Sequence, residues 1–119
     1  MVIELAHRAK RLPPPPHVVF ESLTEPRRTG ARPWLFLEPD EVDPRVLIAD
    51  APERVVWSSL WPSRPDDEIR FSVLPHENET RLVFTHLSPL PIPDEPELRR
   101  LRRRINVLLW ADLRESYDA

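Results

Sequence analysis

The chain has 119 residues, a length that fits a single domain over residues 1–119. Its 17 basic and 20 acidic residues give a formal net charge of −3, which argues against a nucleic-acid partner held through its phosphates. The absence of cysteine excludes disulfides, zinc–thiolate sites and cysteine nucleophiles. No apolar run has the ~18–20 residues of a membrane span and no signal-peptide pattern opens the chain, so we expect a cytoplasmic protein without a membrane partner.

The first expected elements are a strand and a helix joined by four prolines. An alternating pattern, with Ile3, Leu5 and Ala9 on one face, predicts a strand over residues 2–12. The prolines end this strand, because proline cannot donate to a strand ladder. A helical pattern follows at once over residues 17–25, which favours a rigid corner over the alternative, a polyproline ligand for an SH3-type partner.

Four further strands are expected in the middle of the chain. The segments 45–50, 54–61, 68–74 and 80–87 have strand patterns, and turns rich in proline, aspartate or asparagine separate them. Successive strands joined by short turns form an antiparallel meander. The side chains expected to lie on one face of these strands are Val55, Trp57, Ser59, Trp61, Ile69, Phe71, Val73, Leu82, Phe84 and His86.

The last expected element is a helix over residues 95–116. Asp94 can cap it, with Pro96 in its first turn. Five arginines between residues 99 and 104 are interpreted as a solvated face beside acidic neighbours, the alternative being a patch for anions or nucleic acid. The apolar stripe of this helix consists of Leu98, Leu101, Ile105, Leu108, Leu109 and Leu113.

Several motifs occur in the order found in one family. They are PPPPHVVFESLTEP after the first strand, PRVLIADAPERVVWSSLWPSRPDDEIRF in the sheet, TRLVFTHLSPL before the last helix and RINVLLWADLRES within it. On these motifs the chain resembles the SRPBCC or START-like superfamily, and within it the branch of activators of the heat-shock-protein-90 ATPase; the last motif resembles a bacterial subgroup. The resemblance implies the α+β helix-grip fold of the birch pollen allergen, an antiparallel sheet wrapped around a long C-terminal helix. One or two short helices follow the first strand, the second of them a short helix or a turn within residues 27–37.

The sheet is expected to be shorter than is usual in that branch. Its members carry an extra strand pair before the strand that resembles residues 45–50, whereas here only seven loop residues precede Arg45. In the family, the sheet and the long helix enclose an apolar ligand cavity. With fewer strands, we expect this cavity to be small, open to solvent or completed by a second subunit.

Aromatic and apolar side chains of the sheet and the last helix are the candidate ligand contacts. Such side chains can line a pocket for an apolar or aromatic ligand, or they can equally fill the core of so short a chain. Asp112 falls inside the apolar stripe, where it either orients a ligand or tethers the helix to the sheet through an arginine, a tryptophan N–H or His86. The candidate ligand-binding residues are Trp34, Trp57, Trp61, Phe71, Phe84, His86, Ile105, Leu109 and Asp112.

Three functions remain open. The first is a module that binds an apolar or aromatic small molecule. The second is an enzyme resembling the polyketide cyclases or dehydratases of the superfamily, with His86 and Asp112 as acid–base candidates; the third is a protein-interaction module similar to the chaperone-activator branch. A dry pocket favours the first, a wet pocket reached by two titratable groups the second, and a filled core the third. No residue spacing indicates a metal site or a phosphate loop, so we expect neither a metal nor a cofactor.

A homodimer is also expected. Val107 and Trp110 lie about 180° and 120° around the helix from Leu98, away from the apolar stripe. Large apolar groups on the outer side of a helix mark contact sites, and pairing covers a free sheet edge. The expected interface is the outer face of the last helix, the sheet edge or both, unless another segment of the same chain covers Trp110.

Overall fold

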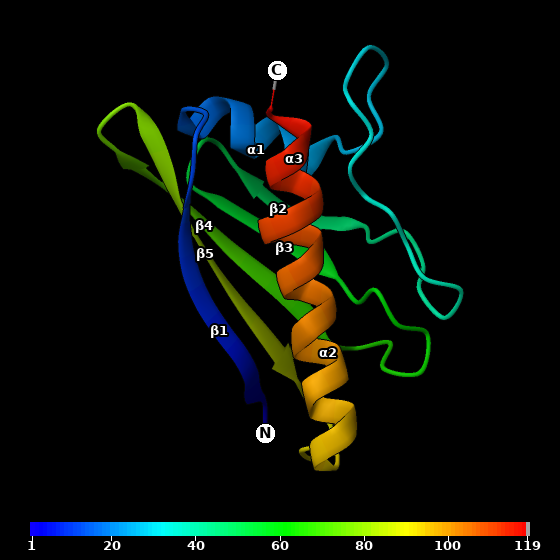
Figure 1. The fold of residues 1–119 in the computed structure, drawn as a ribbon. Helices are drawn as coiled ribbons and strands as arrows, with labels where there is room; N and C mark the ends of the chain where they lie inside the picture. Colours follow the sequence, from blue (N-terminus) through cyan, green and yellow to red (C-terminus); the bar gives the residue numbers. More distant parts are fainter. Residues whose placement is uncertain (119) are drawn as a thin grey trace.

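One antiparallel sheet curves around one long helix (Figure 1), which confirms the predicted architecture. The structure is a computed structural model that describes residues 1–118. The strand order is β1-β5-β4-β3-β2, so β1 and β2 are the free edges of a five-stranded sheet. The elements are β1 (Ile3–Leu12), α1 (Pro16–Thr24), β2 (Val46–Asp50), β3 (Arg54–Ser58), β4 (Glu68–His76), β5 (Glu79–Ser88), α2 (Glu95–Val107), η1 (Leu108–Leu113) and α3 (Arg114–Ser116).

The proline run forms the expected corner between β1 and α1. Helix α1 begins at Pro16, where the missing N–H of proline leaves no intrahelical bond unmade. The hydroxyl of Thr80 on β5 donates to the carbonyl oxygen of Pro14 at 2.9 Å, which fixes the corner to the sheet.

The second short helix does not form, so one helix rather than two follows β1. Within residues 27–37 the chain makes turns and extended segments only. Pro33 pushes the residue before it out of the helical region, and Gly30 adopts a φ of 85°, which no helix accepts. The pieces between these breaks are too short for a stable helix.

Strand β3 ends at Ser58, three residues before the predicted end at residue 61. The cause is Ser59, whose hydroxyl accepts the backbone N–H of Trp61 at 3.0 Å and donates to its carbonyl oxygen at 3.2 Å. Such local serine bonds compete with a strand ladder. Trp61 is nevertheless buried, at 1% exposed, because the resulting turn folds its ring inward.

A β-bulge changes the faces of β1. The pairing of β1 with β5 shifts between Glu4 and Ala6, and beyond the shift Ala6 lies opposite His86 and Arg8 opposite Phe84. A shift by one residue exchanges the two faces of a strand. Arg8 therefore lies on the helix side of the sheet, and Ala9, expected there, lies on the other side.

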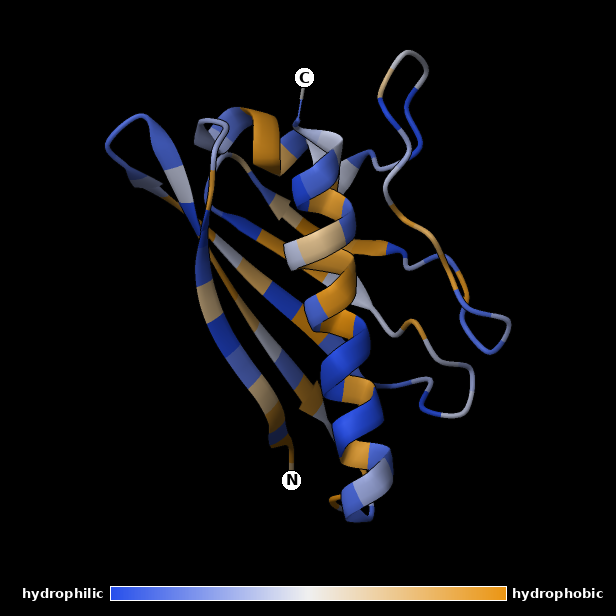
Figure 2. Cartoon of the chain, in the orientation of Figure 1, coloured by the Kyte–Doolittle hydropathy of each residue, from blue (hydrophilic) through white to orange (hydrophobic). Residues whose placement is uncertain are grey.

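The long helix carries both hydrophilic and hydrophobic residues (Figure 2), and those of its apolar stripe belong to the core between helix and sheet. Its start is capped as predicted, because the carboxylate of Asp94 accepts the backbone N–H of Glu97 at 3.0 Å. Of the predicted stripe, Leu101, Ile105, Leu108, Leu109 and Leu113 are buried. Among residues 1–118 no helix has the length and apolar character needed to cross a membrane.

The helix widens near its C-terminal end, and this explains why the predicted orientation of Asp112 is wrong. Helix α2 continues directly into η1, a π-helical segment, and then into α3. One extra residue in a turn rotates the following side chains back by about 100°, the angle that one residue spans. Leu113 therefore takes the angular place that Asp112 would hold in a regular α-helix, and Leu113 is 0% exposed.

Candidate functional site

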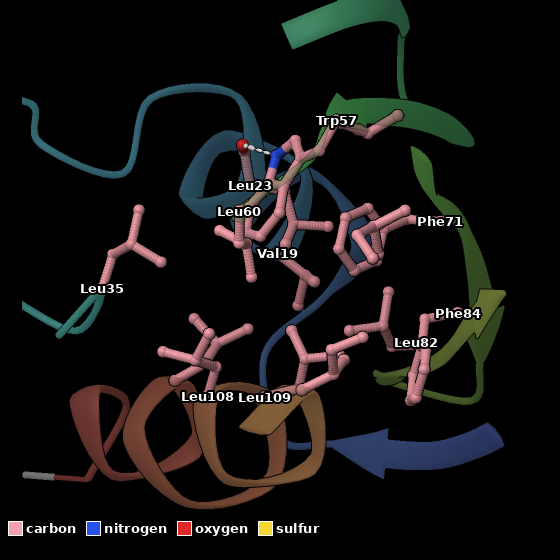
Figure 3. Close-up of a cluster of buried hydrophobic side chains, with 14 of the residues drawn as sticks. Val19, Leu23, Leu35, Trp57, Leu60, Phe71, Leu82, Phe84, Leu108 and Leu109 are labelled. Atoms are coloured by element: carbon pink, nitrogen blue, oxygen red, sulfur yellow. Dashed lines mark hydrogen bonds between the residues drawn. The ribbon is translucent and has the colours of Figure 1, made fainter. Parts of the chain in front are cut away.

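Aromatic residues that were expected to contact a ligand pack on one another in the core, and Figure 3 shows Trp57 beside Phe71 there. The ring of Trp57 lies 6.0 Å from that of Trp34 and 4.8 Å from that of Phe71, and its N–H donates to the carbonyl oxygen of Leu23 at 2.8 Å. Their own side chains thus take up the space that an apolar ligand would need. Eight of the nine candidate ligand residues are at most 2% exposed: Trp34, Trp57, Trp61, Phe71, Phe84, His86, Ile105 and Leu109.

His86 belongs to a buried polar cluster where β4 begins and β5 ends. Its ring stacks on Trp61 at a centroid distance of 5.5 Å, and its Nε2 lies 2.8 Å from Oδ2 of Asp67. The same Oδ2 accepts from Nε of Arg64 at 2.7 Å, and Oδ1 accepts from the hydroxyl of Ser88 at 2.5 Å. The cluster therefore ties the two strands together in a site without access to solvent.

Asp67 is ionised at neutral pH although it is buried. Burial raises the pKa of Asp67, but hydrogen bonds from His86, Ser88 and Arg64 outweigh this effect and hold the pKa below its ordinary value. Because a carboxylate only accepts, the proton of the His86–Asp67 bond is on Nε2 of His86. With a side chain that is 0% exposed, His86 is placed to hold the fold and not to touch a substrate.

The tether that was expected of Asp112 is made by Glu41 instead. The side chain of Glu41 is 0% exposed and accepts from Nη2 and Nε of Arg104 at 2.7 and 2.8 Å and from the indole N–H of Trp61 at 3.2 Å. Burial raises the pKa of Glu41, yet the bonds from Arg104 and from the backbone of Glu38 keep it below the ordinary value. Neither Glu41 nor Asp67 shows a sequence signal, because each lies in an irregular segment without periodicity.

Asp112 lies apart from both buried clusters. It is half-buried and lines a hollow of about 350 Å³ together with Arg32, Pro33 and Phe36. Burial raises the pKa of Asp112, and its side chain makes no hydrogen bond within residues 1–118. His86 does not line this hollow, so the two candidate acid–base residues are not brought together.

A hollow of about 410 Å³ lies between β1 and the long helix, and we call it the β1–helix hollow. The β-bulge shapes its wall, since it turns Ala6 and Arg8 toward the helix. Leu5 and Phe84 are among its lining residues but are buried, at 1% and 0% exposed. The lining residues are Glu4, Leu5, Ala6, His7, Arg8, Phe84, Arg102 and Asn106.

Hydrogen bonds fix the helix wall of the β1–helix hollow. Asn106 accepts the indole N–H of Trp110 at 2.8 Å, and its Oδ1 lies 3.5 Å from a guanidinium nitrogen of Arg8. Arg102 donates from Nε to the carbonyl oxygen of Leu5 at 2.8 Å. These bonds join the helix to β1 across the hollow and hold its polar groups in place.

Trp110 does not point outward as predicted. Its side chain extends toward the start of the helix, over Asn106, and its ring lies 6.2 Å from that of Phe84. The indole is long enough to reach around the side of the helix to the sheet. A helical wheel gives only the angle at which a residue leaves the helix and not the reach of its side chain. Trp110 therefore contacts Phe84 and Asn106, two residues that line the β1–helix hollow, and is half-buried.

Comparison with known proteins places the chain by its fold. No family model and no curated protein matches its sequence. The solution structure of the Aha1 dimer from Colwellia psychrerythraea superimposes with a TM-score of 0.72 at 18% identity, over 98% of this chain and 95% of that one. CalU16 from Micromonospora echinospora superimposes with a TM-score of 0.65 at 18% identity, over 87% of this chain and 68% of that one. An AHSA1-like protein from Rhizobium etli gives 0.61 at 15% identity, over 97% and 81% of the two chains.

The chain has the helix-grip fold, which it shares with these three proteins. In this helix-grip protein the side chains of Trp34, Trp57 and Phe71 fill the space between the middle of the sheet and the helix. The β1–helix hollow lies at one side of the grip, where the bulged edge strand faces Arg102 and Asn106.

Proposed function

We propose that this helix-grip protein binds a small organic molecule in the β1–helix hollow. The observation that carries the proposal is the make-up of this hollow, in which the half-buried Ala6 lies beside the polar groups of Arg8, Arg102 and Asn106. Its volume of about 410 Å³ lies within the ~300–1,000 Å³ typical of small-molecule sites. The proposed site replaces the aromatic core, where the predicted contacts are buried against one another.

A blocking substitution tests this proposal. Ala6→Phe fills the β1–helix hollow, whereas Ala9→Phe places the same ring on the opposite face of β1. Saturation-transfer NMR with naphthalene probes, both neutral and charged, should show binding by the wild type and by Ala9→Phe and its loss in Ala6→Phe. Equal binding by both variants, with melting temperatures like that of the wild type, contradicts a ligand in this hollow.

A protein-interaction module is the second candidate function, and the filled core is the observation that favours it. We propose that the partner is a second copy of the chain, joined along β2, the edge where the sheet is short. Val46 and Leu47 of β2 are 38% and 45% exposed. Antiparallel pairing of two β2 strands brings the Arg45 end of one beside the Asp50 end of the other, so opposite charges meet.

The comparison supports a dimer only as a precedent, since the structure from Colwellia is that of a dimer. Because Trp110 packs toward the sheet, it does not support a dimer interface on the outer face of the long helix. Val107 on that face is 37% exposed. Light scattering should show dimeric wild type and a weakened dimer for Leu47→Lys, with Val107→Lys as the matched control. A monomeric wild type at high micromolar concentration contradicts the dimer.

An enzyme similar to the cyclases or dehydratases stays a prediction without support from the site. His86 is buried and Asp112 lines a different part of the surface, so no described hollow holds both groups. The cytoplasmic location likewise stays a prediction from the sequence.

A further inference from the structure

Arginines of the long helix differ in whether they have carboxylate partners. Arg100 lies 2.9 Å from Asp40 and 2.7 Å from Glu97, and Arg104 lies 2.7 Å from Glu41. Within residues 1–118, Arg102 has no carboxylate within ion-pair distance, although it lies between these two arginines in the sequence. Arg102 is also the arginine of the helix that lines the β1–helix hollow.

The strand side of the same hollow is basic as well. Arg8 lines it and has no carboxylate partner within the described part of the chain; its one side-chain contact is Asn106 at 3.5 Å. Lys10 follows Arg8 on the same face of β1, opposite Leu82. Arg99 precedes Arg102 by about one helical turn. Among the lining residues, Glu4 is the single carboxylate, and it lies opposite Leu87, on the other face of the sheet from Arg8.

From this distribution we infer that the molecule bound in the β1–helix hollow is an organic carboxylate with a flat apolar body. The inference rests on the proposed small-molecule function and names its ligand class. Two guanidinium groups in a chain with a net charge of −3 remain without an acid where a hollow separates them. A carboxylate placed there supplies the missing partner, with the strong charge-assisted bonds that arginine makes to such a group.

The available donors fit this ligand class. Arg102 uses its Nε for the carbonyl oxygen of Leu5, and its two terminal nitrogens have no hydrogen-bond partner among residues 1–118, so they can form a forked pair with a carboxylate. Asn106 is held by Trp110 and by the backbone of Arg102, and its oxygen steadies Arg8 from the helix side. The ring of Trp110, which is half-buried and packs on the buried Phe84, offers the apolar surface for a flat ring system.

A matched pair of probes tests the inference. Isothermal titration calorimetry compares 2-naphthoate with 2-naphthylmethanol, which keeps the ring and lacks the charge. We expect the wild type to bind naphthoate about tenfold more tightly, a preference that falls as salt is raised. Arg102→Gln and Arg8→Gln should each remove most of this preference and leave the affinity for the alcohol unchanged.

Arg103→Gln is the control, because it removes one positive charge from the next position of the same helix without touching the hollow. It should keep the preference. Equal affinity for the two probes overturns the inference and leaves the proposed function standing, whereas no binding of either probe at millimolar concentration overturns both. Loss of the preference in Arg103→Gln but not in Arg102→Gln and Arg8→Gln overturns the inference, because it places the anion outside the hollow.

Discussion

Arginines on the two sides of the long helix differ in their partners and in their exposure. On the side of the loop that follows residue 37, Arg104 is 12% exposed and its guanidinium group meets the buried Glu41 and the carbonyl oxygen of Phe36. On the side of β1, Arg102 is exposed, and within residues 1–118 its side chain bonds only to the carbonyl oxygen of Leu5, beside an open hollow. Arg104 is thus a structural tether, because a loop supplies its carboxylate partner. Arg102, two positions earlier, has no such partner within residues 1–118 and is available to bind an anion.

The largest expected effect is on the tethered side. Glu41→Ala should lower the free energy of unfolding by about 3–5 kcal/mol, because it leaves the guanidinium of Arg104 and the N–H of Trp61 without their acceptor in a buried site. Glu38→Ala, which removes a carboxylate that is 52% exposed and 3.8 Å from Arg104, should cost less than about 1 kcal/mol. Urea denaturation of the two variants measures the difference, and equal losses contradict the tether.

The next effect concerns the widened turn near the end of the helix. Leu113→Ala should cost about 2–5 kcal/mol, since the leucine is 0% exposed. Asp112→Ala should change stability by less than about 0.5 kcal/mol, because Asp112 makes no side-chain hydrogen bond within residues 1–118. If thermal melting shows that Asp112→Ala is the more damaging change, Asp112 faces the sheet as in a regular α-helix, and the π-helical turn is contradicted.

Acid should weaken the protein through its buried carboxylates. The folded-state pKa of Asp67 is lowered, so its contribution to stability is complete above the unfolded pKa of about 3.9 and is lost as the pH falls further. Asp67→Asn should cost about 1–3 kcal/mol at neutral pH and make stability less dependent on pH below about 4. Unfolding free energies of both proteins across this range check the slope; parallel curves rule out the proposed role of Asp67.

The smallest effect on stability is expected at the β1–helix hollow. Arg102→Gln should change the free energy of unfolding by less than about 1 kcal/mol, because the side chain is exposed and gives up one hydrogen bond, to the carbonyl oxygen of Leu5. A loss as large as that of Glu41→Ala would show that Arg102 is a tether too, and the contrast between the two sides of the helix would disappear. Thermal melting of both variants in one buffer makes the comparison.

Regular patterns in the sequence predicted the regular parts of the fold. The alternation of Ile69, Phe71 and Val73 predicts the buried face of β4, and Asp94 predicts the start of the long helix. Two of the wrong predictions each involve one residue that shifts a period: the bulge in β1 moves Ala9 to the outer face, and the π-helical turn replaces Asp112 by Leu113. Neither the bulge nor the π-helical turn can be recognised from the residue composition or from the spacing of apolar residues in the sequence.

The polar clusters could not be predicted for a different reason. Glu41 and Asp67 lie in loops, where the direction of a side chain depends on contacts with distant parts of the chain. Arg104 and His86, their partners, lie 63 and 19 residues further along the sequence. Only the folded arrangement shows which of the many acidic and basic residues meet.

The central claim is that the aromatic core is filled and that a ligand binds beside it, in the β1–helix hollow. The indole N–H signals of Trp110 and Trp57 report on these two places, because the N–H of Trp110 bonds to Asn106 of the hollow and Trp57 lies in the core. In a proton–nitrogen NMR titration with 2-naphthoate, the signal of Trp110 should shift in a saturable way while that of Trp57 stays in place. A saturable shift of Trp57 with Trp110 unchanged would contradict the account, because it would put the ligand inside the core.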